Sequence, residues 1–100
     1  STMNENITYK LQNFFKTQPV EKAWVFGSFS RGEESPESDV DILVKFDKSE
    51  RVSLLRYCKM ICDLETLTGR NIDLVEDGQL KPFAVDSANR DKILIYERTS

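Results

Sequence analysis

The stretch GSFSRGEESPESDVD, from Gly27 to Asp41, contains a Gly-Ser pair, an Arg-Gly pair and two aspartates separated by one residue. It lies between the apolar runs 23–26 and 42–44, which are short, as buried strands are. A polar segment between two such strands is either an ordinary loop or a site that holds a phosphate and a metal ion. The rest of the chain has to decide between these two interpretations.

The length of 100 residues predicts a single domain over residues 1–100. Met3 is a candidate native start, with Ser1 and Thr2 as added residues. Fourteen basic and seventeen acidic residues give a net charge of −3, which argues against non-specific nucleic-acid binding. No apolar run reaches the ~20 residues that span a bilayer, and the N-terminus has no secretion signal. We therefore expect a cytoplasmic protein without a membrane partner.

The chain has two cysteines, Cys58 and Cys62, and no histidine. A structural zinc site usually needs four Cys or His ligands, so this type of site is excluded. At a spacing of four on a predicted helix, the cysteines are expected to be small buried apolar residues. Without histidine, the Ser-His and Cys-His mechanisms are also excluded. If the protein is an enzyme, carboxylates must do its chemistry.

Apolar periodicity and turn residues predict alternating helices and strands, and hence an α/β sheet with helices packed on it. Trp24 is expected in the core. The predicted elements are a helix over 4–16, strands over 20–26 and 40–46, a helix capped by Asp47 or Ser49 and ended by Gly69, a strand over 72–75, a helix over 81–90 opened by Pro82, and a strand over 93–96. The stripe that the middle helix should bury consists of Leu54, Tyr57, Cys58, Ile61 and Leu64.

The Gly27-Ser28 pair directly follows a predicted strand, and residues 29–32 are expected to begin a short helix. Backbone N–H groups at a helix N-terminus are unpaired and partly positive, so they suit an anionic phosphate. Glycine allows that backbone a close approach, and the Ser28 hydroxyl adds a donor. A Gly-Ser pair by itself is often only a turn.

Asp39 and Asp41 lie two residues apart where the second strand begins. Alternate side chains of a strand share a face, so the two carboxylates should project together. Such oxygen ligands, with positions left for water and phosphate, are how proteins usually hold Mg²⁺. The same pair is also common in solvated loops. Asp73 favours the metal site, because a carboxylate in a short apolar strand can join the pair and receive the proton of an acceptor hydroxyl.

Together the motifs 27–32, Ser38-Asp39-Val40-Asp41 and Ile72-Asp73-Leu74-Val75 resemble those of the minimal nucleotidyltransferases (MNT domains) of the DNA polymerase β-like superfamily. The resemblance covers nearly the whole chain. It implies a nucleotidyltransferase-like α/β (α+β) fold, with a mixed sheet of about four strands. By position, Gly27 and Ser28 would hold the terminal phosphates of the nucleotide, and the three aspartates would bind the metals. Arg31 would either neutralise phosphate charge or brace the turn through a carboxylate.

The activity that this resemblance implies is nucleotidyl transfer, most simply of AMP from ATP, with two Mg²⁺ ions or with Mn²⁺. MNT proteins are commonly paired with a HEPN-domain toxin and can place AMP on one of its tyrosines, as an antitoxin. Larger members have an extra helical domain for the acceptor. Here the acceptor is expected from a partner protein or from another copy of the chain.

Two other functions remain open from the sequence. The chain could neutralise a HEPN-type partner by contact alone, with an idle catalytic fold. Three intact aspartates argue against this, because an idle module has no physical reason to keep mutually repelling carboxylates. Adenylation of a small molecule such as an aminoglycoside is disfavoured by the missing acceptor domain.

Overall fold

The computed structural model describes residues 2–32, 35 and 37–99. Ser1, Ser100 and three residues of the quoted stretch, Glu33, Glu34 and Pro36, lie outside this description. Helices and strands alternate in the predicted order, so the α/β expectation is confirmed. The elements are α1 (Thr2–Phe15), β1 (Val20–Phe26), α2 (Gly27–Ser30), β2 (Val40–Phe46), α3 (Leu54–Thr68), β3 (Ile72–Glu76), α4 (Pro82–Asp91) and β4 (Ile93–Glu97).

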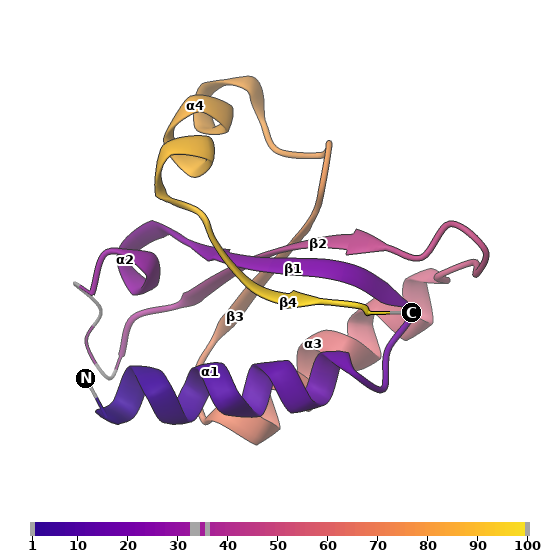
Figure 1. Cartoon of the computed structure of the whole chain (residues 1–100), viewed down its shortest axis with the longest axis horizontal. Helices are drawn as coiled ribbons and strands as arrows, with labels where there is room; N and C mark the ends of the chain where they lie inside the picture. Colours follow the sequence, from indigo (N-terminus) through magenta and orange to yellow (C-terminus); the bar gives the residue numbers. More distant parts are fainter. Residues whose placement is uncertain (1, 33–34, 36, 100) are drawn as a thin grey trace.

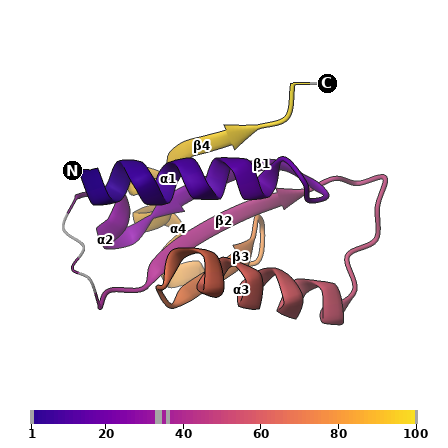
Figure 2. The same ribbon diagram turned by 90° about the horizontal axis from the view of Figure 1, so that it is seen from below.

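The strands form one mixed sheet in the order β3-β2-β1-β4. β1 runs antiparallel to both of its neighbours, whereas β2 and β3 are parallel. A parallel pair needs a crossover connection, which α3 supplies. Helices α1 and α3 cover one face of the sheet, and α4 stands on the other side (Figure 1), which the view from below also shows (Figure 2).

The core lies between the sheet and the pair α1 and α3. Its β2 members are Val40, Ile42 and Val44, all fully buried. Because side chains alternate along a strand, Asp41 between them projects from the opposite face. The same alternation in β3 buries Ile72 and Leu74 and leaves the intervening aspartate on the face of Asp41. The remaining core residues are Ile7, Leu11, Phe15, Val20, Ala23, Val25, Phe29, Met60 and Leu64.

Helix α3 begins later than the sequence suggested. Its N-cap is Ser53, whose side chain accepts a hydrogen bond from the backbone N–H of Arg56 at 3.1 Å. Asp47 instead accepts bonds from the backbone N–H and the hydroxyl of Ser49, at 2.9 and 2.8 Å, and so closes a local turn. Asp47 and Ser49 as helix caps were therefore wrong, because these side chains are already used two residues apart. Gly69 ends the helix at a φ of +68°, as expected.

The buried stripe of α3 also differs from the predicted one. Met60 and Leu64 are buried, and Tyr57 and Ile61 pack against the core. Cys58 and Cys62 are exposed, so their assignment as buried residues was wrong. Leu54 is exposed too. The spacing 57, 60, 61 and 64 describes the inner face of this helix, and the cysteines lie on its outward side.

Trp24 is only half-buried, because it lies on β1 opposite Leu43 and away from the α1 side of the sheet. The Nζ atom of Lys92 lies 5.0 Å from the centroid of its ring, within the range of a cation–π interaction. The expectation of a core tryptophan was therefore met only in part. In the part of the chain that the structure describes, no helix is long and apolar enough to cross a membrane.

Candidate functional site

The turn after β1 leads directly into a short helix. α2 begins at Gly27 rather than at residue 29, and Phe26 is its N-cap residue in an extended conformation. The Gly27 carbonyl accepts hydrogen bonds from the Ser30 hydroxyl at 2.8 Å and from the Arg31 backbone N–H at 3.4 Å. The N–H groups of this first turn have no intrahelical acceptor, and an anion is one of the partners that can satisfy such groups.

Gly27 is required at its position for two independent reasons. Its φ of +68° lies in the left-handed region that other L-residues rarely adopt. In addition, a Cβ added there would overlap the carboxylate oxygen Oδ2 of Asp41 and lie 3.2 Å from its Cγ. Phe26 and Asp41 are partners in the β1–β2 register, which brings the turn and the carboxylate together. The backbone of the turn thus packs directly against the aspartate.

The three aspartates meet at one end of the β2–β3 pair. Asp41 and Asp73 are direct partners in the parallel register, and Asp39 immediately precedes β2. Asp41 is half-buried, whereas Asp39 and Asp73 are exposed. Asp41 and Asp73, 32 positions apart in the sequence, are therefore neighbours. The sequence suggested this arrangement on the condition that their strands were adjacent.

The pKa of the Asp41 carboxyl is raised from its ordinary value of 3.8 to about 6, and burial is the largest cause. The nearby carboxylates of Asp73 and Asp39 and a hydrogen bond with Asp73 contribute to this rise, whereas the Arg31 guanidinium opposes it. Accumulated negative charge therefore disfavours ionisation of Asp41. Perturbed carboxyls of this kind concentrate at functional sites, although structural charge networks also produce them.

The donor set of this cluster fits a hard divalent cation. Mg²⁺ is usually held by one or two carboxylates and completes its shell with waters and substrate phosphates. A cation beside Asp41 and Asp73 would also relieve the repulsion that raises the pKa of Asp41. Among the described residues, however, no three His, Cys, Asp or Glu side chains are arranged to hold one ion by themselves. Phosphate or water oxygens would have to complete the shell.

Arg31 has a carboxylate partner on a distant segment. Its Nη1 atom lies 2.6 Å from Oδ2 of Asp91, the last residue of α4. This ion pair joins α2 to α4, which is the bracing role that the sequence left open for Arg31. The side chain is also close enough to Asp41 to lower its pKa. Arg31 therefore stands between the carboxylate cluster and α4.

Two features of the site had no signal in the sequence. Asp91 is one of many acidic residues on helices, and only the fold places it beside Arg31, 60 residues away. Arg70 follows the glycine that ends α3, and its side chain is buried at 7% exposure against the segment before Asp39. Charged residues are mostly exposed, so the sequence alone favoured a surface position.

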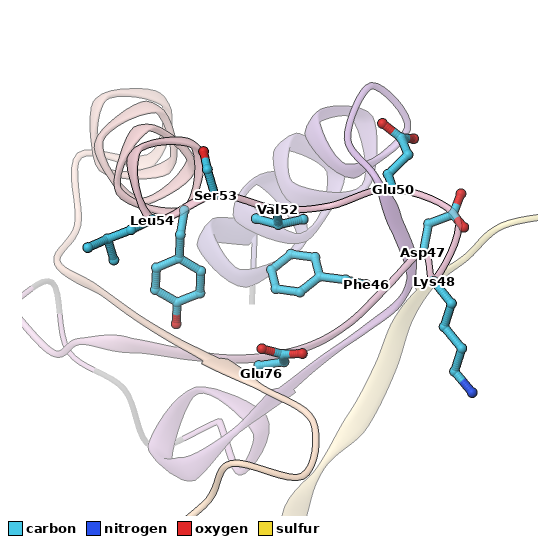
Figure 3. Close-up of a pocket in the computed structure, with 9 residues that line it drawn as sticks. Phe46, Asp47, Lys48, Glu50, Val52, Ser53, Leu54 and Glu76 are labelled. Carbon is cyan, nitrogen blue, oxygen red and sulfur yellow. The ribbon is translucent and has the colours of Figure 1, made fainter.

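A cavity of about 530 Å³ is lined by none of the three aspartates Asp39, Asp41 and Asp73. Figure 3 shows it between the end of β2 and the start of α3, with Phe46 and Val52 toward its centre and Glu76 at one side. Glu76 ends β3 on the α3 side of the sheet, three residues beyond Asp73 and on the opposite face. The position of this cavity therefore gives no support to a role in phosphate chemistry.

Comparisons with known proteins agree on one family. Residues 9–100 match the family model described as polymerase beta, nucleotidyltransferase. The protein adenylyltransferase MntA of Thermococcus cleftensis is 40% identical over 76 residues, which cover 76% of this chain and 75% of that protein. A glycine turn packed against paired carboxylates on a mixed sheet is the site that this class of enzyme would need.

Two solved structures share the fold at low sequence identity. A toxin–antitoxin crystal structure with AMP-PNP has a TM-score of 0.75 at 16% identity, covering 92% of this chain and 74% of that one. A tri-AMPylated Shewanella oneidensis HEPN toxin in complex with its MNT antitoxin has a TM-score of 0.70 at 13% identity, covering 95% and 73%. This chain belongs to the polymerase β nucleotidyltransferase family, as a minimal nucleotidyltransferase.

Proposed function

We propose that this nucleotidyltransferase moves AMP from ATP to a hydroxyl group, with Mg²⁺ as the metal, and that the acceptor is a tyrosine of a HEPN-type toxin. The observation that supports the proposal most directly is the contact between the Gly27 backbone and Asp41, beside Asp73. The proposed anion-binding turn is therefore in direct contact with one of the proposed cation-binding carboxylates. A nucleoside triphosphate with its metal ion likewise carries negative and positive charge next to each other.

The acceptor and donor follow from the similar proteins. The Thermococcus relative is named a protein adenylyltransferase, and one structure of the same fold contains AMP-PNP. Another contains an AMPylated HEPN toxin with an MNT antitoxin. By this analogy the chain is the antitoxin, and the toxin supplies the acceptor hydroxyl and the remaining wall of the pocket.

In the transfer step, the acceptor oxygen forms a bond to the α-phosphorus of ATP. The bond between that phosphorus and the oxygen bridging to the β-phosphorus breaks, and pyrophosphate leaves with the electron pair. In this proposal the acceptor proton passes to the carboxylate of Asp73, which is exposed on the face of the sheet that it shares with Asp41. When bound, Mg²⁺ would neutralise phosphate charge and polarise the phosphoryl oxygens.

The chain's own residues have separate tasks in this proposal. Backbone N–H groups at Gly27 and Ser28 hold the terminal phosphates, and Asp39 and Asp41 hold the metal, with Asp73 next to them. Arg31 supports the turn through Asp91 and presents its positive charge to the phosphates.

A calorimetric titration of ATP, with and without Mg²⁺, tests this function without the toxin. We expect Mg²⁺-dependent binding to the wild-type protein and a loss of at least about 100-fold in affinity for the Asp39→Asn/Asp41→Asn variant, because both charges that hold the metal are removed. The matched control is Asp77→Asn/Asp86→Asn, which removes the same charge from two exposed positions outside the cluster. Equal binding by all three proteins would contradict the assigned site.

No binding by the wild-type protein would have a different meaning. The titration would then be repeated with a co-expressed HEPN partner, since the partner is proposed to complete the pocket. If the complex also failed to bind ATP, neutralisation by contact alone would replace the catalytic proposal.

Asp73→Asn separates catalysis from binding. We expect the rate of AMP transfer to fall by about 100-fold or more, because the proton acceptor is lost, while the affinity for Mg²⁺-ATP changes less than 10-fold. Pre-steady-state transfer of labelled AMP to the toxin and calorimetric binding measure the two effects. An equal loss of both would make Asp73 mainly a metal ligand.

A further inference from the structure

Among the residues that the structure describes, Arg70 is the one polar or charged residue that is buried, with 7% of its surface exposed. It lies between α3 and β3, next to the glycine that ends the helix. A buried guanidinium needs acceptors for its donors, because an uncompensated buried charge is strongly destabilising. The identity of these acceptors therefore indicates the role of Arg70.

Two backbone carbonyls of the segment that leads to Asp39 accept hydrogen bonds from Arg70. Nε and Nη2 of Arg70 donate to the carbonyl of Ser38, at 3.1 and 2.8 Å, and Nη2 also donates to the carbonyl of Ser35 at 2.7 Å. Ser38 is the residue immediately before Asp39. The guanidinium thus fixes the peptide from which the first aspartate of the site extends.

Further bonds connect the same segment to the β3 side of the sheet. The backbone N–H of Val40 donates to the carbonyl of Asn71 at 2.9 Å, and the Ser38 backbone N–H closes the turn by donating to the carbonyl of Ser35 at 3.0 Å. Arg70 and Asn71 immediately precede Ile72, the first residue of β3, and Asp73 is the second residue of that strand. Arg70 therefore couples the position of Asp39 to the strand that supplies Asp73.

We propose that Arg70 is a positioning residue of the nucleotide site, acting through the Ser35–Ser38 turn on Asp39. Its Nε and Nη2 donors are directed to these two carbonyls, so its effect on the site passes through the backbone. The planar fork of arginine spans both carbonyls at once, whereas a lysine ammonium is a single point of charge. The effect on nucleotide binding rests on the proposed function, but the effect on the turn does not.

The test compares Arg70→Met and Arg70→Lys with the control Arg98→Met. Arg98 donates to the Asp47 carboxylate and, through Nη2, to the carbonyl of Gln18 at 3.0 Å, so its loss removes similar bonds beyond the opposite end of β2 from Asp39 and Asp41. The first readout is amide hydrogen exchange at Asp39 and Val40, followed by NMR without nucleotide or metal. After correction for global stability, we expect exchange about 10-fold faster or more in Arg70→Met, and unchanged in Arg98→Met.

The second readout is the affinity for Mg²⁺-ATP. We expect it to weaken by about 10- to 100-fold in Arg70→Met, as for other residues that orient a ligand, with Arg70→Lys intermediate and Arg98→Met near the wild type. Equal affinity in Arg70→Met and Arg98→Met would overturn the positioning role. If the wild-type protein failed to bind Mg²⁺-ATP, the proposed function would be in question, and unchanged exchange at Asp39 and Val40 in Arg70→Met would still refute the role of Arg70.

Discussion

Replacing Gly27 with alanine will abolish Mg²⁺-ATP binding and destabilise the fold. The new methyl group would occupy the position of the Asp41 carboxylate, at a backbone φ of +68°. The left-handed backbone costs about 1 kcal/mol and the overlap a further 1 to 3 kcal/mol, so we expect a total loss of roughly 2 to 4 kcal/mol. Urea unfolding measures the stability, and calorimetry the binding. Relief of the overlap by movement of Asp41 would displace a proposed metal ligand, so we expect binding to be lost in that case too.

Gly69→Ala is the matched control for this substitution. Gly69 has the same φ of +68°, and an added Cβ there would meet nothing within 4 Å. We therefore expect only the conformational cost of about 1 kcal/mol and normal nucleotide binding. Equal losses of stability in the two variants would show that the contact with Asp41 is unimportant.

A second mutation tests the contact itself. In the double variant Gly27→Ala/Asp41→Ala the overlap disappears, so the effects on stability should be non-additive by about 1 kcal/mol or more. Nucleotide binding should not return, because a proposed metal ligand is missing. Additive effects would indicate that the backbone strain alone destabilises Gly27→Ala.

The sequence was informative where short-range patterns determine structure. Both apolar runs around the quoted stretch form strands with the predicted bounds, since each is bordered by glycine or by polar residues. The alternation of side chains predicted that Asp73 could join Asp41 if their strands were neighbours, and the parallel pairing of β2 and β3 meets this condition. These inferences required only the periods of regular structures.

Prediction failed where several overlapping patterns were compatible with the sequence. On α3, a stripe through Cys58 and one through Met60 are both helical, and only packing against α1 and the sheet selects the second. Arg70 was missed for another reason. It donates to backbone carbonyls 32 and 35 residues away. Every residue has a backbone carbonyl, so the sequence does not indicate which carbonyls will accept these bonds.

Asp41→Asn will raise the melting temperature of the metal-free protein at neutral pH while it abolishes nucleotidyl transfer. In the folded protein the pKa of Asp41 is about 6 instead of 3.8, so the folded state binds more protons than the unfolded state between these values. The contribution of this carboxyl to stability is therefore most favourable below pH 3.8 and is lost as the pH rises through 6. At pH 7 the ionised carboxylate is a net cost, which asparagine avoids.

The size of this cost follows from the shift, reduced for solvent screening of a half-buried group. The full pKa shift would correspond to a loss of roughly 3 kcal/mol in the free energy of unfolding. After the reduction for screening, about 1 to 2 kcal/mol remains, which corresponds to roughly 5 to 10 °C in melting temperature. Thermal unfolding with a chelator present, from pH 4 to 8, measures it. The advantage of Asp41→Asn over the wild-type protein should grow between pH 4 and pH 7 and then level off.

The exposed Asp86 provides the control, because Asp86→Asn removes one negative charge outside the cluster. Its melting temperature should follow the wild-type protein across the same range of pH. Saturating Mg²⁺ should then reverse the order of stability, because the proposed metal site is intact in the wild-type protein and lacks one ligand in Asp41→Asn. A lower melting temperature for Asp41→Asn at pH 7 without metal would mean that the Asp41 carboxylate stabilises the fold through its neighbours, and that the cluster is a structural network rather than a strained metal site.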